Sequence, residues 1–342
     1  MFRTNVFLLG CCLLFSLPVF AQSNKSQPVE LGEVQWLRDF DQAIDQSKQT
    51  GKPVFILFQE VPGCSTCRNY GQNVLSHPLI VEAIETLFVP LAIYNNHKGA
   101  DYKVLSFYKE PAWNNPVVRI VASDKQDIIP RVSGNYSQLG VVRAMRQALD
   151  LRGIVTPMYL QLLEEELYGK VQGTETAILA MHCFWVGEGQ YGQMDGVIAT
   201  EPGFMNGREV VQVEYVPDQL SYSDLITVGK KVNCANQAYT DNQEQKSEAK
   251  QILGSGQVAS TASFRTDREP KYYLSRTIYR HIPMTSLQAT RANALVGKRQ
   301  SPDHLLSSRQ LAILQKVKAN PSRKWENLIG VSLEAGWQKV LE

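Results

Sequence analysis

Short apolar runs alternate with helical repeats along the first part of the chain. The run 53–58 has the length of a strand, and similar runs follow at 88–94 and 117–121. Apolar spacing typical of helices predicts one helix over 79–87 and an amphipathic one over 141–149. Strands that alternate with helices in this way indicate an α/β domain.

The pattern changes near residue 152, where a second domain is expected to begin. A helical stretch over 159–167 leads into a strand-like run at 177–181. The polar stretch 238–256 has weak helical spacing, which indicates an exposed helix or a mobile insertion.

The end of the chain is mainly helical. Helices are predicted over 286–295, 307–318 and 325–341, and Pro302 and Pro321 separate them. Their leucines and alanines recur at helical spacing, which more often means packing onto a domain than a binding site for a partner.

Length and pattern together predict the domain organisation. A chain of 342 residues suits two domains, because a domain usually has roughly 100–200 residues. The expected parts are a signal peptide (1–22), a first domain (23–152), a second domain (153–280) and a helical C-terminal extension (281–342).

The first residues predict export to the periplasm or the outside of the cell. Arg3 precedes a nearly apolar run over 6–19, and Ala21-Gln22 fits a cleavage site. Cleavage of a lipoprotein at Cys11 is the alternative, but little apolar chain precedes that cysteine. No later segment has the ~20 apolar residues that a transmembrane helix needs, so no stable membrane insertion is expected.

Net charge and cysteine content limit the functions that the chain can have. The net charge of +2 gives no electrostatic reason to expect nucleic acid as a partner. Four cysteines remain after the predicted signal peptide, namely Cys64, Cys67, Cys183 and Cys234. They are too sparse for a disulfide-stabilised scaffold, so we expect them to carry chemistry.

The first two of these cysteines follow a predicted strand and a turn at Pro62-Gly63. A helix that begins near Ser65 would bring free backbone N–H groups and the positive end of the helix dipole to Cys64. This environment lowers the pKa of a thiol, as a reactive cysteine requires. Cys67 lies one turn further on and can close a disulfide with Cys64.

This order of strand, Cys-x-x-Cys, helix and later strands over residues 33–150 resembles the thioredoxin fold. The resemblance implies that Pro116, just before a strand, is the cis-proline that faces the cysteine pair. Half of a zinc site and a structural disulfide are the alternatives. No second pair has metal-ligand spacing and no glycine motif cradles a phosphate, so neither a metal nor a cofactor is expected.

Cys183 also stands between a predicted strand and a predicted helix, and it gains the same stabilisation from the helix terminus. The sequence around it, His182-Cys183-Phe184-Trp185, resembles the A-type peptide methionine sulfoxide reductases. Matching motifs span about residues 175–279 and lie at Gly196–Thr200, Gly203–Gly207, Glu209–Tyr215, Ser221–Leu225 and Asp267–Tyr272. The resemblance implies an α+β second domain.

That resemblance also implies a chemistry. Cys183 would attack the sulfur of a methionine sulfoxide, and Glu209 would supply the proton for the departing oxygen. Phe184 and Trp185 would form the apolar wall that receives the methyl group. The substrate would be oxidised methionine, as the S epimer, in peptides or proteins.

The remaining roles follow from the same resemblance. Asp267 and Tyr272 would orient the sulfoxide oxygen by hydrogen bonds. The sulfenic acid left on the attacking cysteine condenses with a second thiol, for which Cys234 is the candidate. The pair Cys64 and Cys67, or a separate thioredoxin-type protein, would then supply electrons.

The chain departs from that family at two places. His182 stands where the family has glycine, and only Arg208 separates Gly207 from Glu209, so a substrate-binding tyrosine of the family has no counterpart. Two other functions therefore stay open. The chain could be a general thiol-disulfide reductase or isomerase, or the second domain could bind peptides without catalysis.

Overall fold

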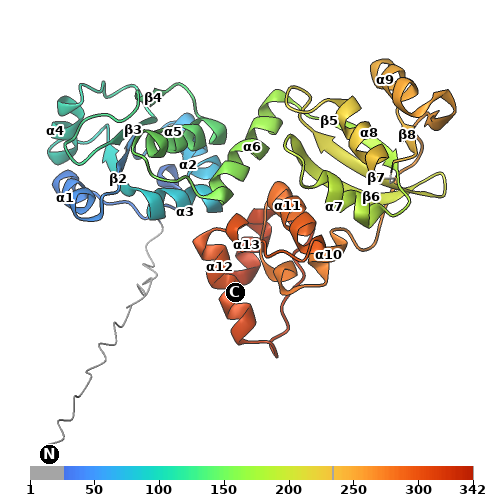
Figure 1. The fold of residues 1–342 in the computed structure, drawn as a ribbon. Coiled ribbons are helices and arrows are strands. Elements are labelled where there is room, and N and C mark those ends of the chain that lie inside the picture. Colours follow the sequence, from blue (N-terminus) through green and yellow to red (C-terminus); the bar gives the residue numbers. More distant parts are fainter. Residues whose placement is uncertain (1–26, 233–234, 342) are drawn as a thin grey trace, which may run out of the picture.

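The computed structural model describes residues 27–232 and 235–341. Over these residues the chain forms two domains, each built around its own sheet, and helix α6 (Met158–Gln172) connects them (Figure 1). The C-terminal helices, orange and red in Figure 1, lie below and between the two domains. The predicted signal peptide and Cys234 lie outside the described residues.

The first domain has a four-stranded sheet in the order β2-β1-β3-β4. Strand β1 (Val54–Gln59) lies parallel to β2 (Val89–Tyr94) and antiparallel to β3 (Val117–Val121), which pairs with the short β4 (Val132–Ser133). The three long strands coincide with the three apolar runs of the sequence, so the predicted α/β class of this domain is confirmed.

Helices cover both faces of this sheet. They are α1 (Phe40–Thr50), α2 (Ser65–Asn73), α3 (Pro78–Leu87), α4 (Ala100–Phe107) and α5 (Gln138–Leu151). Alternate residues of β1 enter two different cores: Val54, Ile56 and Phe58 pack with α1 and α4, and Phe55 and Leu57 pack with α3 and α5. Burial on both faces explains why the strand is an unbroken apolar run.

The second domain has a six-stranded sheet in the order β10-β6-β7-β5-β8-β9. The strands are β5 (Glu175–Ala180), β6 (Val197–Met205), β7 (Arg208–Tyr215), β8 (Gln237–Tyr239), β9 (Val258–Ala259) and β10 (Arg265–Thr266). All neighbours are antiparallel except β8 and β9. Helix α7 (Phe184–Tyr191) packs on β6 and β7, and α8 (Tyr222–Lys231) packs on β5, which confirms the predicted α+β class.

The turn between β6 and β7 is shorter than the resemblance implied. The motif over 203–207 resembles a glycine-rich turn of the reductase family, but β6 continues to Met205 and only Asn206-Gly207 forms the turn. Both turn residues have positive φ, 51° and 75°, which suits the tight hairpin that joins two twisted strands. Gly203 lies inside the strand instead, where a Cβ atom would come within 2.5 Å of the Phe264 ring.

The C-terminal part contains α10 (Tyr272–Ser275), α11 (Ser286–Gly297), α12 (Ser308–Ala319) and α13 (Leu333–Leu341). The helix predicted over 325–341 begins only at Leu333, because Gly330 takes a left-handed conformation with φ of 79°. The Ser332 hydroxyl then caps the helix by accepting a hydrogen bond from the Ala335 backbone N–H at 3.3 Å.

This C-terminal part contacts both domains. Helix α11 packs on α7 and β6 of the second domain, and α13 packs on α3 of the first. The backbone N–H of Arg309, in α12, donates to the Glu82 carboxylate at 2.8 Å, and its guanidinium pairs with Glu85. The two domains are therefore joined twice, through α6 and through the C-terminal helices.

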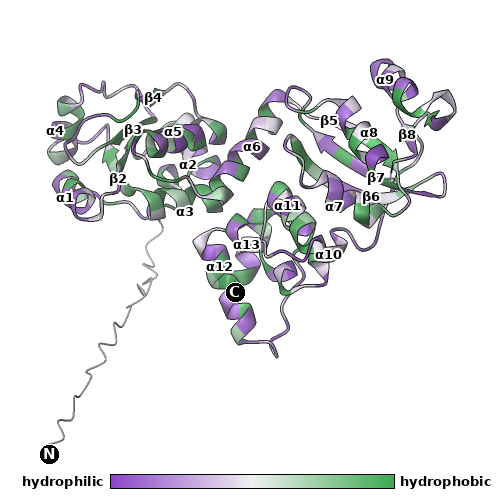
Figure 2. Ribbon diagram, in the orientation of Figure 1, coloured by the Kyte–Doolittle hydropathy of each residue, from purple (hydrophilic) through white to green (hydrophobic). Residues whose placement is uncertain are grey.

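Helix α9 (Gln243–Leu253) lies in the polar stretch for which we predicted an exposed helix or a mobile insertion. It is a regular helix, mostly hydrophilic in Figure 2, that packs on α8 through a buried Ala249. Among the helices of 27–232 and 235–341, none combines the length and the apolar character needed to cross a bilayer.

A buried ion pair fixes α7 in the second domain. Glu188 is fully buried, and its carboxylate accepts hydrogen bonds from Lys271 Nζ at 2.9 Å and from the Thr200 hydroxyl at 3.1 Å. Lys271 also donates to the backbone carbonyl of Thr200. Asn293 of α11 donates to the same carboxylate at 3.5 Å and accepts from the backbone N–H of Leu274 at 3.0 Å. The pair thus connects α7, β6, α10 and α11.

Glu188→Gln should destabilise the second domain strongly, because the Lys271 ammonium would stay buried without a counter-charge. We expect a loss of about 3–5 kcal/mol in the free energy of unfolding, measured by urea denaturation. The double variant Glu188→Gln/Lys271→Met should lose clearly less, since it removes both charges. An equal loss in both variants would show that the charge pair is not the source of the effect.

Candidate functional site

The first cysteine pair lies where β1 gives way to α2. Cys64 is the residue before the first helical turn and is exposed, whereas Cys67 lies one turn further on and is fully buried. Their sulfur atoms are 3.6 Å apart and both thiols are free. The predicted helix start near Ser65 is confirmed, and the pair is placed to close a disulfide.

The two thiols differ in acidity. The pKa of Cys64 is lowered, chiefly by a hydrogen bond from the Cys67 backbone N–H, while its small desolvation opposes the effect. Burial, and then the hydrogen bond with Cys64, raises the pKa of Cys67 to about 12. This difference suits Cys64 to the role of attacking thiolate and Cys67 to that of the thiol that resolves a mixed disulfide.

Pro116 stands directly before β3, and the Asn115-Pro116 peptide bond is cis. The Asn115 side-chain oxygen accepts a hydrogen bond from the Cys67 thiol at 2.8 Å and another from the Glu60 backbone N–H at 3.0 Å. The structure thus brings the loop that holds Pro116 against the cysteine pair, as the resemblance implied. Sequence reasoning missed Asn115, because its contact spans 48 residues of chain.

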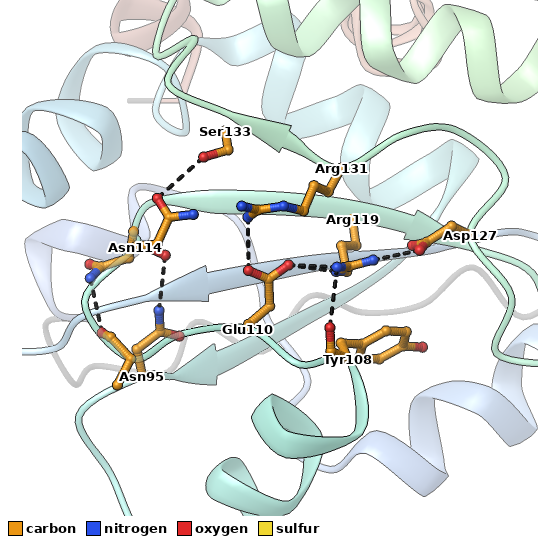
Figure 3. A network of polar contacts seen from close by, with 10 residues as sticks. Asn95, Tyr108, Glu110, Asn114, Arg119, Asp127, Arg131 and Ser133 are labelled. Carbon is orange, nitrogen blue, oxygen red and sulfur yellow. Dashed lines mark hydrogen bonds and ion pairs between the residues drawn. The ribbon is translucent and has the colours of Figure 1, made fainter.

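A network of charges holds this loop in place (Figure 3). Glu110 is buried, and its carboxylate pairs with Arg119 of β3 at 2.7 Å and with Arg131 at 2.8 Å. Arg119 also pairs with Asp127, and the Asn114 side-chain amide is hydrogen-bonded to the Ser133 hydroxyl at 3.2 Å. Because Arg119 lies in β3 and Ser133 lies in β4, these contacts attach the segment before Pro116 to the sheet of the first domain.

The turn before Cys64 is equally constrained. Gly63 donates its backbone N–H to the buried Glu30 carboxylate at 2.8 Å. A Cβ atom on Gly63 would lie 2.6 Å from the Cys67 Cβ, so only glycine fits. Within the residues that the structure describes, one group of side chains could hold a metal ion, and it is here: the ligand atoms of Glu60, Cys64 and Cys67 lie within 4.8 Å of one another.

The second cysteine site repeats this geometry at the junction of β5 and α7. Cys183 is the residue before the first turn of α7 and is half-buried. Glu209, at the start of β7, accepts a hydrogen bond from the Phe184 backbone N–H at 2.9 Å, and its own carbonyl accepts from Met181 N–H at 2.9 Å. The Glu209 carboxylate therefore lies at the helix terminus beside the cysteine.

The other predicted residues gather around Trp185. Its indole N–H donates to Asp267 at 3.2 Å, and the Tyr272 ring stacks on it with centroids 3.7 Å apart. The Arg276 guanidinium lies over the same tyrosine ring at 3.4 Å, so Tyr272 is held between two flat groups. Phe184 is buried and packs against Phe204 of β6 with centroids 5.3 Å apart.

Tyr273 is a residue of this site that sequence reasoning left aside. Its ring packs over Gly297 of α11 and Gly189 of α7. A Cβ atom added to Gly297 would lie 2.8 Å from the ring, and one added to Gly189 would lie 3.8 Å from it. Burial raises the pKa of its hydroxyl, and negative charge at Cys183, at Tyr272 and at Glu188 raises it further. The doubled tyrosine in the sequence was the signal for this residue.

Comparison with known proteins finds similarities that each cover part of the chain. A family model described as thioredoxin-like matches residues 35–123. Among solved structures, a DsbH oxidoreductase covers 40% of this chain and 96% of its own length, at 17% identity and a TM-score of 0.31. At this score the structural match carries no further conclusion.

Curated relatives match part of the chain. Peptide methionine sulfoxide reductase MsrA of Methanococcus maripaludis is 39% identical over an alignment of 70 positions, and the match covers 16% of this chain and 45% of that protein. MsrA of Salinispora arenicola is 32% identical over an alignment of 102 positions, and that match covers 24% of this chain and 46% of that protein. The chain thus spans about half the length of the curated relatives that it matches.

The fold, the two cysteine sites and these similarities define the class. The chain carries an N-terminal thioredoxin-like domain fused to a domain that resembles the A-type peptide methionine sulfoxide reductases. Together they support a thiol oxidoreductase.

The difference in acidity between Cys64 and Cys67 predicts that the two thiols are alkylated by iodoacetamide at different pH values. The measurement uses a Cys183→Ser/Cys234→Ser background, and peptide mass spectrometry follows each cysteine as the pH is raised. Because its pKa is lowered, Cys64 should react at a pH below that of an ordinary thiol, and Cys67 should stay unmodified until the pH nears 12. Cys67→Ser keeps the backbone N–H that contributes most to lowering the pKa of Cys64. Alkylation of Cys64 in this variant should therefore still begin at a pH below that of an ordinary thiol. A Cys64 profile like that of a free thiol would contradict the assignment.

Proposed function

We propose that this protein is an exported thiol oxidoreductase that reduces the S epimer of methionine sulfoxide in peptides or proteins. One observation carries the proposal: the Glu209 carboxylate is hydrogen-bonded at 2.9 Å to the backbone N–H that follows Cys183. A nucleophilic thiol and a proton donor are thereby held side by side at one helix terminus. The indole of Trp185, with Tyr272 stacked on it, supplies the apolar surface that a methyl group requires.

The proposed reaction begins with attack of the Cys183 thiolate on the sulfoxide sulfur. Glu209, in its protonated form, gives its proton to the sulfoxide oxygen, and oxygen passes to the cysteine as the S–O bond of the substrate breaks. The products are the thioether of methionine and a sulfenic acid on Cys183. Asp267 accepts the indole N–H of Trp185 and so fixes the wall of the pocket.

The sulfenic acid is then removed by a second thiol, with release of water and formation of a disulfide. Cys234 stays the predicted resolving thiol, and it lies outside the described residues. Asn236, two positions later, donates its backbone N–H to the Ala180 carbonyl at 3.3 Å, three residues before Cys183. Reduction of that disulfide takes two electrons, for which the Cys64/Cys67 pair or a separate thioredoxin-type protein is the proposed donor.

A second candidate is general thiol-disulfide reduction or isomerisation. The exposed Cys64 thiol with its lowered pKa favours it, because disulfide exchange needs only an accessible thiolate with a resolving partner. In this function Cys183 would exchange disulfides without meeting a sulfoxide.

Turnover of the two methionine sulfoxide epimers by the mature protein, with dithiothreitol as reductant, separates these functions. We expect reduction of the S epimer alone, and Cys183→Ser should fall to the uncatalysed rate because it lacks the nucleophile. Cys64→Ser is the matched control and should keep the dithiothreitol-driven turnover. No turnover of either epimer, in a protein that still reduces disulfides, would leave the second candidate.

Tyr273→Phe should lower kcat/KM for the S epimer about tenfold, as loss of one hydrogen bond to a developing charge would. The charge of Cys183 is one cause of the raised pKa of this hydroxyl, and we expect the hydroxyl to take the role of the family's tyrosine, which has no counterpart in this chain. Tyr279→Phe is the control, because that hydroxyl is bonded to Asp303 in the C-terminal part and should not affect kcat/KM. Equal activity of Tyr273→Phe and the parent protein would exclude this role.

A further inference from the structure

The side chain of Glu60 lies beside the Cys64/Cys67 pair. The Glu60 carboxylate lies at the end of β1, and its ligand oxygen and the two sulfur atoms are all within 4.8 Å of one another. Glu60 is half-buried, Cys67 is buried and Cys64 is exposed, so the group is closed on the protein side and open to solvent on the other. The sequence suggested no metal because it offers no second cysteine pair, but a carboxylate completes a set of three ligands here.

We propose that the reduced pair and Glu60 form a binding site for Zn²⁺. A zinc–sulfur bond is about 2.3 Å long, and sulfur atoms 3.6 Å apart then subtend an angle of roughly 103° at the ion, close to tetrahedral. The carboxylate is the third ligand, and the fourth position faces solvent beside the exposed Cys64. Two sulfurs and one oxygen suit zinc rather than Mg²⁺ or Ca²⁺, which prefer oxygen ligands alone.

The surroundings of the two sulfurs favour such an ion. Gly63 has no side chain, and a Cβ atom there would come within 3.2 Å of the Cys67 sulfur. The Asn115 amide oxygen accepts from the Cys67 thiol at 2.8 Å and from the Glu60 backbone N–H at 3.0 Å, so one side chain holds two of the three ligand residues in place before the ion binds. Its hydrogen bond with Cys67 ends when the thiol proton leaves, and its hydrogen bond with the Glu60 backbone does not depend on that proton.

Zinc binding involves no oxidation or reduction: the ion takes two thiolates and one carboxylate, and two thiol protons pass to solvent. The disulfide form cannot bind in this way, because its sulfur atoms are about 2.05 Å apart and carry no thiolate charge. Zinc would therefore hold the first domain in its reduced form and block disulfide exchange at Cys64. This inference stands independently of sulfoxide reduction at Cys183.

The test is a Zn²⁺ titration of the reduced mature protein against a chromophoric chelator, in a Cys183→Ser/Cys234→Ser background. We expect one site that disappears when the pair is oxidised and in Cys64→Ser. Glu60→Gln should weaken binding about tenfold, which corresponds to about 1.4 kcal/mol. Glu33→Gln, which alters an exposed glutamate outside the site, should bind as the parent does.

The far-ultraviolet circular dichroism spectrum checks that Glu60→Gln is folded. In the parent background, added Zn²⁺ should inhibit disulfide reduction, and Glu60→Gln should need about ten times more of the ion for the same fractional inhibition. Binding by Glu60→Gln that equals the parent's would overturn the proposal, because any free cysteine pair would then account for it. Binding by the oxidised protein that equals the reduced protein's would overturn it as well.

Discussion

Both halves of this protein depend on one local constraint, which is the transition from a buried strand to a short helix with a cysteine at the first helical turn. In each case the strand is anchored inside a sheet, so the first turn of the helix is fixed at the sheet's edge. Cys64 and Cys183 both precede that turn, where backbone N–H groups have no helical partner. A thiol in this position faces solvent while its backbone is held by the core.

What differs between the two sites is the group that shares the helix terminus. In the first domain it is a second thiol, one turn further along the same helix, and the pair can store two electrons. In the second domain it is a carboxylate from a different strand, which suits proton transfer, and a stacked tryptophan and tyrosine lie beside it. The same backbone geometry thus supports disulfide exchange in one domain and the proposed oxygen transfer in the other.

Local pattern sufficed for β1, β2, β3 and β5 and for both strand–cysteine–helix junctions, because apolar runs, turn residues and helix starts depend on consecutive residues. Local pattern did not predict contacts between residues that are far apart in the sequence. The contact of Asn115 with Cys67, the approach of Glu60 to the cysteine pair and the packing of Tyr273 over two glycines are set by pairing of distant elements. The late start of α13 depended on one left-handed glycine, a choice that helical spacing alone does not reveal.

The Glu82 contact also has a consequence for the order in which the molecule can be completed. Glu82 is buried in α3, and a backbone N–H that binds its carboxylate comes from Arg309, 227 residues later in the chain. During synthesis from the N-terminus, the first domain emerges long before that partner exists. Its surface at α3 therefore stays unfinished, with a carboxylate that lacks its α12 donor, until almost the whole chain has been made. Packing of the C-terminal helices against α3 is therefore the last step in completing the fold.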